Sequence, residues 1–284
     1  MRRDRDQPTL DNDCHRIVNE YPVIRAAFKH GFKAPDALWL DTEHRLLPDG
    51  DFIVMRRAPG SPGGTVFSAA NKISDELLNV LAQTLAGLHS LPPLLELGDL
   101  TESINPEMWS LSLRGATRQY ISGYREIYLR DVADASPAIL ALYGWVLNNL
   151  PDPPGRTVLC HGDVGFHNMV LDRGELSALV DWEFAHVGDP AEDLAYVRNT
   201  AGATLDWNKF LAAYYAAGGI EIDPVRLHFF QAWGQLRNAT ASAVTINCLV
   251  TGKHNVLKLA HTGFYHLPNF MAAAAQIISA GPAT

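Results

Sequence analysis

The segments His161-Gly162-Asp163-Val164-Gly165-Phe166-His167-Asn168 and Asp181-Trp182-Glu183 decide the fold of this 284-residue chain. Between them, two short apolar runs flank Asp172-Arg173-Gly174-Glu175, a pattern typical of a β-hairpin. The hairpin would bring the polar residues of the two segments together.

The length of the hairpin loop decides which side chains share a face. If the loop is Arg173-Gly174 alone, Asn168 lies opposite Leu179, and Asn168 and Asp181 project from one face about 7–8 Å apart. A three-residue loop would reverse this parity. One cation with oxygen ligands at about 2.1 Å could bridge that separation.

The side chains gathered in this way offer hard oxygen atoms, which Mg²⁺ prefers: Asp163, Asn168, Asp181 and Glu183. Phosphoryl transfer needs a carboxylate that orients the attacking hydroxyl and metal ions that neutralise the polyphosphate. Plainer interpretations stay open, since Asp163 could bond within its turn, Asn168 could cap a turn, and Asp181 could form an Asx-turn.

In these segments the chain resembles the aminoglycoside-phosphotransferase family, relatives of protein and choline kinases. The family motif HGDxxxxN is similar to residues 161–168, and DWExAxxGDPxxDLA is similar to residues 181–195. The resemblance implies a kinase that uses ATP and Mg²⁺ and phosphorylates a hydroxyl of a small molecule. It also implies Asp163 as catalytic base, Asn168 and Asp181 as metal ligands, and Glu183 as a further ligand.

Weaker resemblances follow upstream in the order that the family has. Asn19-Glu20-Tyr21 is similar to the (R)EY helix motif, Arg2 or Arg3 would be the basic residue of the third strand that pairs with it, and Phe52–Met55 with Gly60 is similar to the hinge. The nucleotide-binding residues that this implies are Arg2, Glu20, Met55 and Arg57.

The resemblance predicts an α+β, protein-kinase-like fold with two lobes. We place the boundary in the Pro/Gly-rich residues 58–64, with a partial N-terminal lobe over 1–58 and a helical C-terminal lobe carrying the catalytic hairpin over 59–284. Residue patterns predict strands over 37–40, 52–55 and 157–160, and helices over 13–30, 74–90, 106–130, 137–150 and most of the chain from Asp189.

A kinase of this type covers the phosphates with a glycine-rich loop. The glycine clusters here lie at residues 60–64 and at Gly218-Gly219, where neither could cover them. Either the natural protein is longer, which we favour, or the chain is a degenerate kinase, acting as a pseudokinase or nucleotide-binding module. Backbone amides missing from the phosphate site would lower catalysis directly. A metal-dependent phosphohydrolase using the same carboxylates is a third interpretation.

The amino-acid composition argues against several classes of binding partner. A formal net charge of −8 argues against a nucleic-acid surface, and no apolar run approaches the roughly 20 residues that span a bilayer. Three cysteines without CxxC spacing suggest neither a disulfide framework nor a zinc site, so a cytoplasmic location fits best. The oligomeric state is left open, a homodimer included.

The charges of the C-terminal region indicate which kind of acceptor molecule the chain could bind. From Asp206 onwards there are three acidic and five basic residues. Aminoglycosides are polycations whose sites need carboxylates, so this balance favours a neutral or anionic acceptor. The cations that suit such an acceptor are Arg226, Arg237, Lys253 and Lys258. Family members that phosphorylate hydroxyacyl groups linked to coenzyme A are one class that the resemblance offers.

Three residues in the motifs are predicted to be structural. His161 is expected to brace its loop, and Asp193 to brace the catalytic loop rather than touch substrate. Asp189 is expected to cap a helix, with Pro190 after it and Glu192 completing a capping box.

Overall fold

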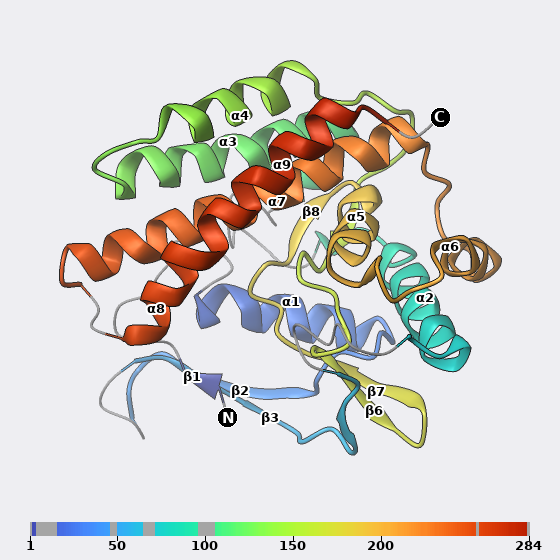
Figure 1. The fold of residues 1–284 in the computed structure, drawn as a ribbon. Coiled ribbons are helices and arrows are strands. Elements are labelled where there is room, and N and C mark those ends of the chain that lie inside the picture. Colours follow the sequence, from blue (N-terminus) through green and yellow to red (C-terminus); the bar gives the residue numbers. More distant parts are fainter. Residues whose placement is uncertain are drawn as a thin grey trace.

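The computed structural model describes residues 16–45, 50–64, 72–95, 106–253 and 256–282, and the backbone of residues 2–3. It is an α+β structure in which a small sheet and one helix lie beside a mainly helical part (Figure 1). The strands are β1 (Arg2–Arg3), β2 (Ala37–Asp41), β3 (Phe52–Met55), β4 (Ser61–Pro62), β5 (Val158–Cys160), β6 (Met169–Asp172), β7 (Glu175–Leu179) and β8 (His186–Gly188). The helices are α1 (Ile17–Lys29), α2 (Asp75–His89), the 3₁₀ helix η3 (Pro106–Ser110), α3 (Leu113–Asp131), α4 (Pro137–Asn148), α5 (Pro190–Ala201), α6 (Trp207–Ala216), α7 (Pro224–Val250), α8 (Leu257–His261), the π-helix η4 (Thr262–His266) and α9 (Leu267–Ala280).

Helix α1 ends where the sequence predicts. Gly31 adopts a left-handed φ of +85°, and the backbone N–H groups of Gly31 and Phe32 return to the carbonyls of Phe28 and Ala27 at 2.9 and 3.0 Å. This is a Schellman motif, which satisfies carbonyls that the helix end would leave unpaired. The helix continues through Pro22, which lies inside it.

The first sheet has the order β1-β3-β2, with all pairs antiparallel. Arg2 pairs with Ile53 and Arg3 with Phe52, so the first described residues form an edge strand of this sheet, next to the central strand β3. Phe52 and Ile53 are both buried, and as neighbours in a strand they point to opposite faces of the sheet. Ile53 belongs to the main hydrophobic cluster, Phe52 packs edge-on against Trp39, and α1 packs against β2 and β3.

The Pro/Gly-rich segment predicted as the boundary is packed against the hairpin. Strand β4 pairs with β6, with Ser61 opposite Leu171. Gly60 has φ +99°, and a Cβ there would lie 1.9 Å from the carbonyl oxygen of Leu171. Only glycine allows this close backbone approach.

The catalytic hairpin has the predicted two-residue loop, but the predicted register is wrong. Arg173 and Gly174 both have positive φ, as a type I′ turn requires, and Asp172 pairs with Glu175. A register shift between Val170 and Leu171 then leaves Ser177 without a paired residue, so Met169 rather than Asn168 lies opposite Leu179. Because this β-bulge adds one residue, the face shared by Asn168 and Asp181 no longer follows from strand alternation.

The predicted helix over 106–130 is divided. Ser112 caps α3 by accepting a hydrogen bond from the N–H of Gly115 at 3.1 Å, so the preceding residues form the separate helix η3. Within the described part of the chain, no helix combines the length and apolarity needed to cross a membrane.

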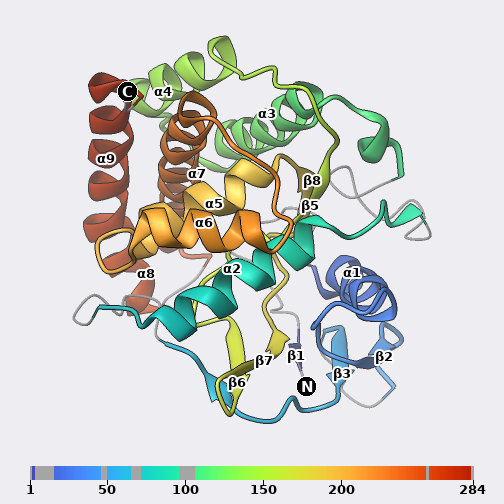
Figure 2. The same ribbon diagram turned by 90° about the vertical axis from the view of Figure 1, so that its right-hand side faces the viewer.

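One hydrophobic cluster runs through the N-terminal sheet, the hairpin and the helices, and it includes Ile24, Ile53, Leu85, Leu159 and Phe230. Helix α7 is central to the helical part, since it packs against α3, α4, α5 and α9. Figure 2 shows α1 and its sheet at the lower right and α3, α4, α7 and α9 at the top and left. The small β5–β8 pair was not predicted from the sequence, and it fixes the end of β5, directly before the loop that carries Asp163.

Candidate functional site

Asp163 lies in the loop between β5 and β6, where three side chains contact its carboxylate. The Asn168 amide nitrogen donates to Oδ2 at 3.0 Å, and the Tyr196 hydroxyl donates to Oδ1. The Nε2 atom of His167 lies 3.6 Å from Oδ2. The Asp163 side chain remains 17% exposed, so it is held in place and still reachable from solvent.

These contacts set the charge of Asp163. Burial raises the pKa of its carboxyl, but hydrogen bonds from His167 and Tyr196 and the nearby His161 outweigh burial and leave the pKa below its usual value. Asp163 is therefore a carboxylate at neutral pH. Burial and this carboxylate raise the pKa of Tyr196 well above its usual value, so Tyr196 stays a hydroxyl donor.

Asn168 is buried, and the direction of its amide follows from its partners. Its nitrogen donates both to Oδ2 of Asp163 and to the Asp163 carbonyl, the latter at 2.9 Å. Both partners are oxygens, so the NH₂ group must face them, and the amide oxygen is the atom that could bind a cation.

Asp181 is brought beside Asn168 by the backbone. The N–H of Val180 donates to the carbonyl of Asn168 at 2.8 Å, and Asp181 follows directly. Asp181 has a left-handed φ of +68°, which is uncommon outside glycine and is concentrated at functional sites. Glu183 is half-buried two residues further on.

Glu20 reaches this loop from α1. Its carboxylate, which is 2% exposed, accepts a hydrogen bond from the N–H of Trp182 at 3.1 Å. The predicted ion pair of Glu20 with Arg2 or Arg3 lies outside the described residues, because only the backbone of those arginines is described. Met55 is half-buried at the end of β3, and Arg57 is exposed in the hinge that follows.

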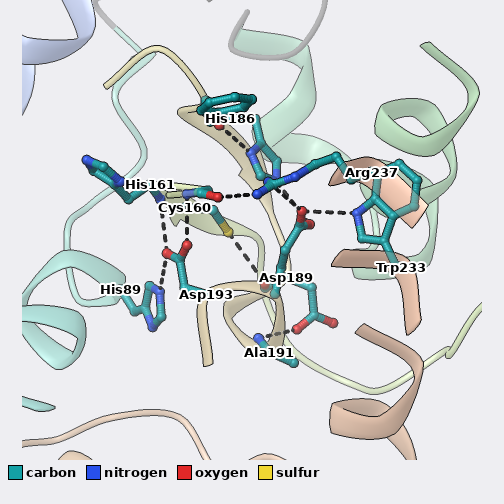
Figure 3. Close-up of polar contacts among 12 residues, drawn as sticks. His89, Cys160, His161, His186, Asp189, Ala191, Asp193, Trp233 and Arg237 are labelled. Carbon is teal, nitrogen blue, oxygen red and sulfur yellow. Dashed lines mark hydrogen bonds and ion pairs between the residues drawn. The ribbon is translucent and has the colours of Figure 1, made fainter. Parts of the chain in front are cut away.

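Asp193 braces the loop before Asp163, as predicted. Its carboxylate accepts from the N–H groups of His161 and Gly162 at 2.9 and 2.8 Å, and His89 approaches it at 3.1 Å (Figure 3). His161 is also structural, since it is fully buried, contacts the Val180 carbonyl at 3.0 Å and packs edge-on against Trp182.

Arg237 of α7 braces the same loop from the other side. It donates to the Gly162 carbonyl and lies 3.4 Å from the Glu192 carboxylate (Figure 3). Glu192 also accepts from Trp233 at 3.0 Å and lies 3.2 Å from His186. The capping-box prediction is therefore wrong for Glu192, because its carboxylate serves this buried network.

Arg226 has a similar position. It is 4% exposed and makes bonds of 2.6 to 2.9 Å to the Asp189 carboxylate, which also caps α5 through the N–H of Ala191 at 2.8 Å. The sequence interpretation of Arg226 and Arg237 as cations suited to the acceptor is therefore wrong, because each is buried and paired with a carboxylate. Lys253 and Lys258 remain exposed.

A family model described as "Phosphotransferase enzyme family" (APH) matches residues 1–230. The chain belongs to this phosphotransferase family. It is 30% identical over 196 residues to acyl-CoA dehydrogenase family member 11 of Gallus gallus, which covers 66% of this chain but only 23% of that protein. The chain therefore spans less than a quarter of the length of that relative.

Solved structures of phosphotransferases share the fold. A putative aminoglycoside phosphotransferase from Ralstonia eutropha has a TM-score of 0.71 at 16% identity, covering 93% of this chain and 83% of that one. A thermostable mutant of aminoglycoside phosphotransferase APH(4)-Ia, in ternary complex with AMP-PNP and hygromycin B, has a TM-score of 0.61 at 17% identity, with the same coverage of both chains. The predicted kinase-like fold is thereby confirmed.

The donor atoms of this phosphotransferase fit Mg²⁺, because the Asn168 amide oxygen and the Asp181 and Glu183 carboxylates are hard oxygen ligands. No group of three or more His, Cys, Asp and Glu side chains among the described residues is arranged to hold a metal. Mg²⁺ commonly keeps several waters and needs only one or two carboxylates from the protein.

Tyr196 is the residue of the site that the sequence did not indicate. It directly follows the DLA motif, at a helical position where an aromatic side chain would ordinarily be assigned to the hydrophobic core. The sequence did hold one indication of its role. Tyr196 lies three residues after Asp193 in the same helix, so both side chains project from the side of α5 that faces the loop of Asp163.

Proposed function

We propose that the chain transfers the γ-phosphate of ATP to a hydroxyl group of a small molecule, in a reaction that needs Mg²⁺. The observation that carries the proposal is the Asp163 carboxylate, which is charged, partly exposed and hydrogen-bonded to Asn168, while the backbone of Asn168 is bonded to Val180, directly before Asp181. Membership of the phosphotransferase family supports the same reaction class.

In this proposal Asp163 is the general base. It accepts the proton of the acceptor hydroxyl as the new O–P bond forms and the bond between the γ-phosphorus and the β–γ bridging oxygen breaks, which leaves ADP. Asn168, Asp181 and Glu183 would hold Mg²⁺, which supplies positive charge against the polyphosphate. Glu20, fixed at the Trp182 backbone, keeps the Asp181–Glu183 loop in place.

The nucleotide would lie between the N-terminal sheet and the hairpin. Met55 and Arg57 lie in the hinge, and Arg2 lies in a strand paired with β3, which ends at Met55. These placements support the implied roles of Arg2, Glu20, Met55 and Arg57 in nucleotide binding.

For the acceptor we propose a neutral or anionic hydroxylated molecule, with hydroxyacyl thioesters as one class. No Asp or Glu follows Asp223 in the sequence, so α7 to α9 offer a polycation no carboxylates. Exposed apolar side chains, among them Leu257, Phe264 and Tyr265, lie in the same region as Lys253 and Lys258. The described cysteines Cys160 and Cys248 are buried free thiols, which fits a cytoplasmic location.

The test is ATP turnover with Mg²⁺ and either 3-hydroxybutyryl-coenzyme A or hygromycin B as acceptor, for the wild type, Asp163→Asn and Asp181→Ala. We expect ADP formation that depends on the thioester, a loss of roughly 100-fold or more in Asp163→Asn with Mg·ATP binding retained, and weakened Mg·ATP binding in Asp181→Ala. Equal Mg·ATP binding by Asp181→Ala would contradict the metal assignment. Faster turnover of hygromycin B would contradict the acceptor class, and phosphate release without an acceptor would indicate a hydrolase.

A further inference from the structure

The two oxygens of the Asp163 carboxylate are held by different parts of the chain. Oδ2 is held within its own loop, by Asn168 at 3.0 Å and by His167 at 3.6 Å. Oδ1 is held from outside the loop, by the hydroxyl of Tyr196 on α5. A carboxylate held at one oxygen can still rotate about its Cβ–Cγ bond, whereas one held at both has a fixed plane.

Tyr196 is itself fixed. The guanidinium of Arg237 lies 5.5 Å from the centre of the Tyr196 ring and 5.2 Å from that of Phe184, within the range of cation–π contacts. Arg237 is anchored in turn by the Gly162 carbonyl and the Glu192 carboxylate. The hydroxyl that meets Asp163 therefore belongs to a ring whose position is set by α5 and α7.

We propose that Tyr196 is a positioning residue, which holds Oδ1 of Asp163 so that the carboxylate plane is fixed before the acceptor arrives. This inference rests on the proposed role of Asp163 as general base. A base held in the productive direction spares the reaction the cost of orienting it, and misplacement of a reacting group by about 1 Å can reduce rates on the order of 100-fold.

The groups that surround this contact come from three elements. His161, His167 and Asn168 belong to the loop of Asp163, Asp193 belongs with Tyr196 to α5, and Arg237 belongs to α7. Among the described residues, the side chains that bond to the Asp163 carboxylate are Tyr196 from α5 and Asn168 and His167 from the carboxylate's own loop. Removing the Tyr196 hydroxyl thus leaves Oδ1 without its donor from outside the loop.

The test is Tyr196→Phe, which removes the hydroxyl and keeps the ring beneath Arg237. With Mg·ATP and 3-hydroxybutyryl-coenzyme A, we expect kcat to fall roughly 10- to 100-fold while the KM values of both substrates stay within about twofold. The control is Tyr128→Phe, which removes a buried hydroxyl that accepts from the N–H of Ser136 at 2.7 Å, in α3 and away from Asp163. It should lose some thermal stability and keep its kcat.

An unchanged or raised kcat in Tyr196→Phe would overturn the proposal, and so would an equal fall in Tyr128→Phe. A second measurement does not depend on turnover. In protein labelled with ¹³C at the tyrosine ζ carbon, the resonance absent from Tyr196→Phe should shift in Asp163→Asn, and no shift would also overturn the proposal. If the wild type phosphorylates neither acceptor, the proposed function fails, while this resonance still decides whether Tyr196 holds the carboxylate.

Discussion

At Gly162, the loop that carries Asp163 packs tightly against the loop that carries Asp181 and Glu183. Gly162 has φ +77°, and a Cβ there would lie 2.5 Å from the Phe184 carbonyl oxygen and 2.9 Å from the Phe184 Cβ. Any other residue would meet both an unfavourable backbone conformation and a backbone neighbour that cannot turn aside. The glycine of the HGD motif is therefore explained by space as well as by conformation.

We expect Gly162→Ala to destabilise the protein by about 2–5 kcal/mol, from left-handed strain plus overpacking. The matched control is Gly174→Ala in the hairpin turn, where φ is +84° and nothing lies within 4 Å of the added Cβ. It should cost about 1–2 kcal/mol. Urea unfolding measures both, and equal losses would show that the Phe184 contact carries no cost.

Contacts between individual residues could be predicted from the sequence where both residues lie in the same short motif. Asp163 and Asn168 are five residues apart in one loop, so their contact is local and the spacing alone indicates it. Tyr196 meets Asp163 across 33 positions, and its partner could be found only after α5 had been placed against the loop.

Helix α7 is the element that holds the site from the C-terminal side. Arg226 and Arg237 both lie on it, and their partners Asp189 and Glu192 lie at the start of α5. Breaking a buried ion pair leaves a charge without compensation, which typically costs about 3–5 kcal/mol.

We therefore expect Arg226→Met to lower the free energy of unfolding by about 3–5 kcal/mol. The control is Lys209→Met, which removes an ion pair of 3.0 Å to Asp75 between side chains that are 56% and 63% exposed. Exposed pairs contribute little, so this variant should unfold like the wild type. Thermal or chemical unfolding decides, and a similar small loss in both variants would contradict the structural role of Arg226.

Elements were predictable from the sequence where a local signal marks them. Gly31 ends α1, Ser74 caps α2, and Arg173-Gly174 closes the hairpin. The bulge at Ser177 and strand β8 were missed for one reason. Both depend on the partner strand, since β8 has only three residues and pairs with β5, which lies far from it in the sequence.

Acid stability is a property of the whole molecule that depends on Asp193. Burial raises the pKa of its carboxyl, but the bonds from His89 and from the backbone of His161 outweigh burial and lower the pKa to about 2. A lowered folded-state pKa contributes stability above the unfolded-state pKa of about 4, and this contribution disappears as the pH falls toward 2.

We expect the free energy of unfolding of the wild type to fall as the pH drops from about 5 to 2, with Asp193 contributing on the order of 2 kcal/mol. Asp193→Asn should be less stable than the wild type at neutral pH, because the loop loses its carboxylate, and this difference should shrink as the pH falls toward 2. Its unfolding free energy should also depend less on pH across this range. Parallel pH curves for the two proteins, measured by urea unfolding, would contradict this role of Asp193.

The position of Arg237 bears on how such a chain can be joined to other domains. The stretch that marks family membership ends at residue 230, yet Arg237, which fixes the loop of Asp163 and the ring of Tyr196, lies beyond it. In a fusion protein, or in a shuffled gene, a junction made at the edge of the recognisable family segment would cut α7 and remove this arginine. A segment that keeps this site intact when it is joined to another domain is therefore longer than the segment that matches the family, and it extends at least through the end of α7.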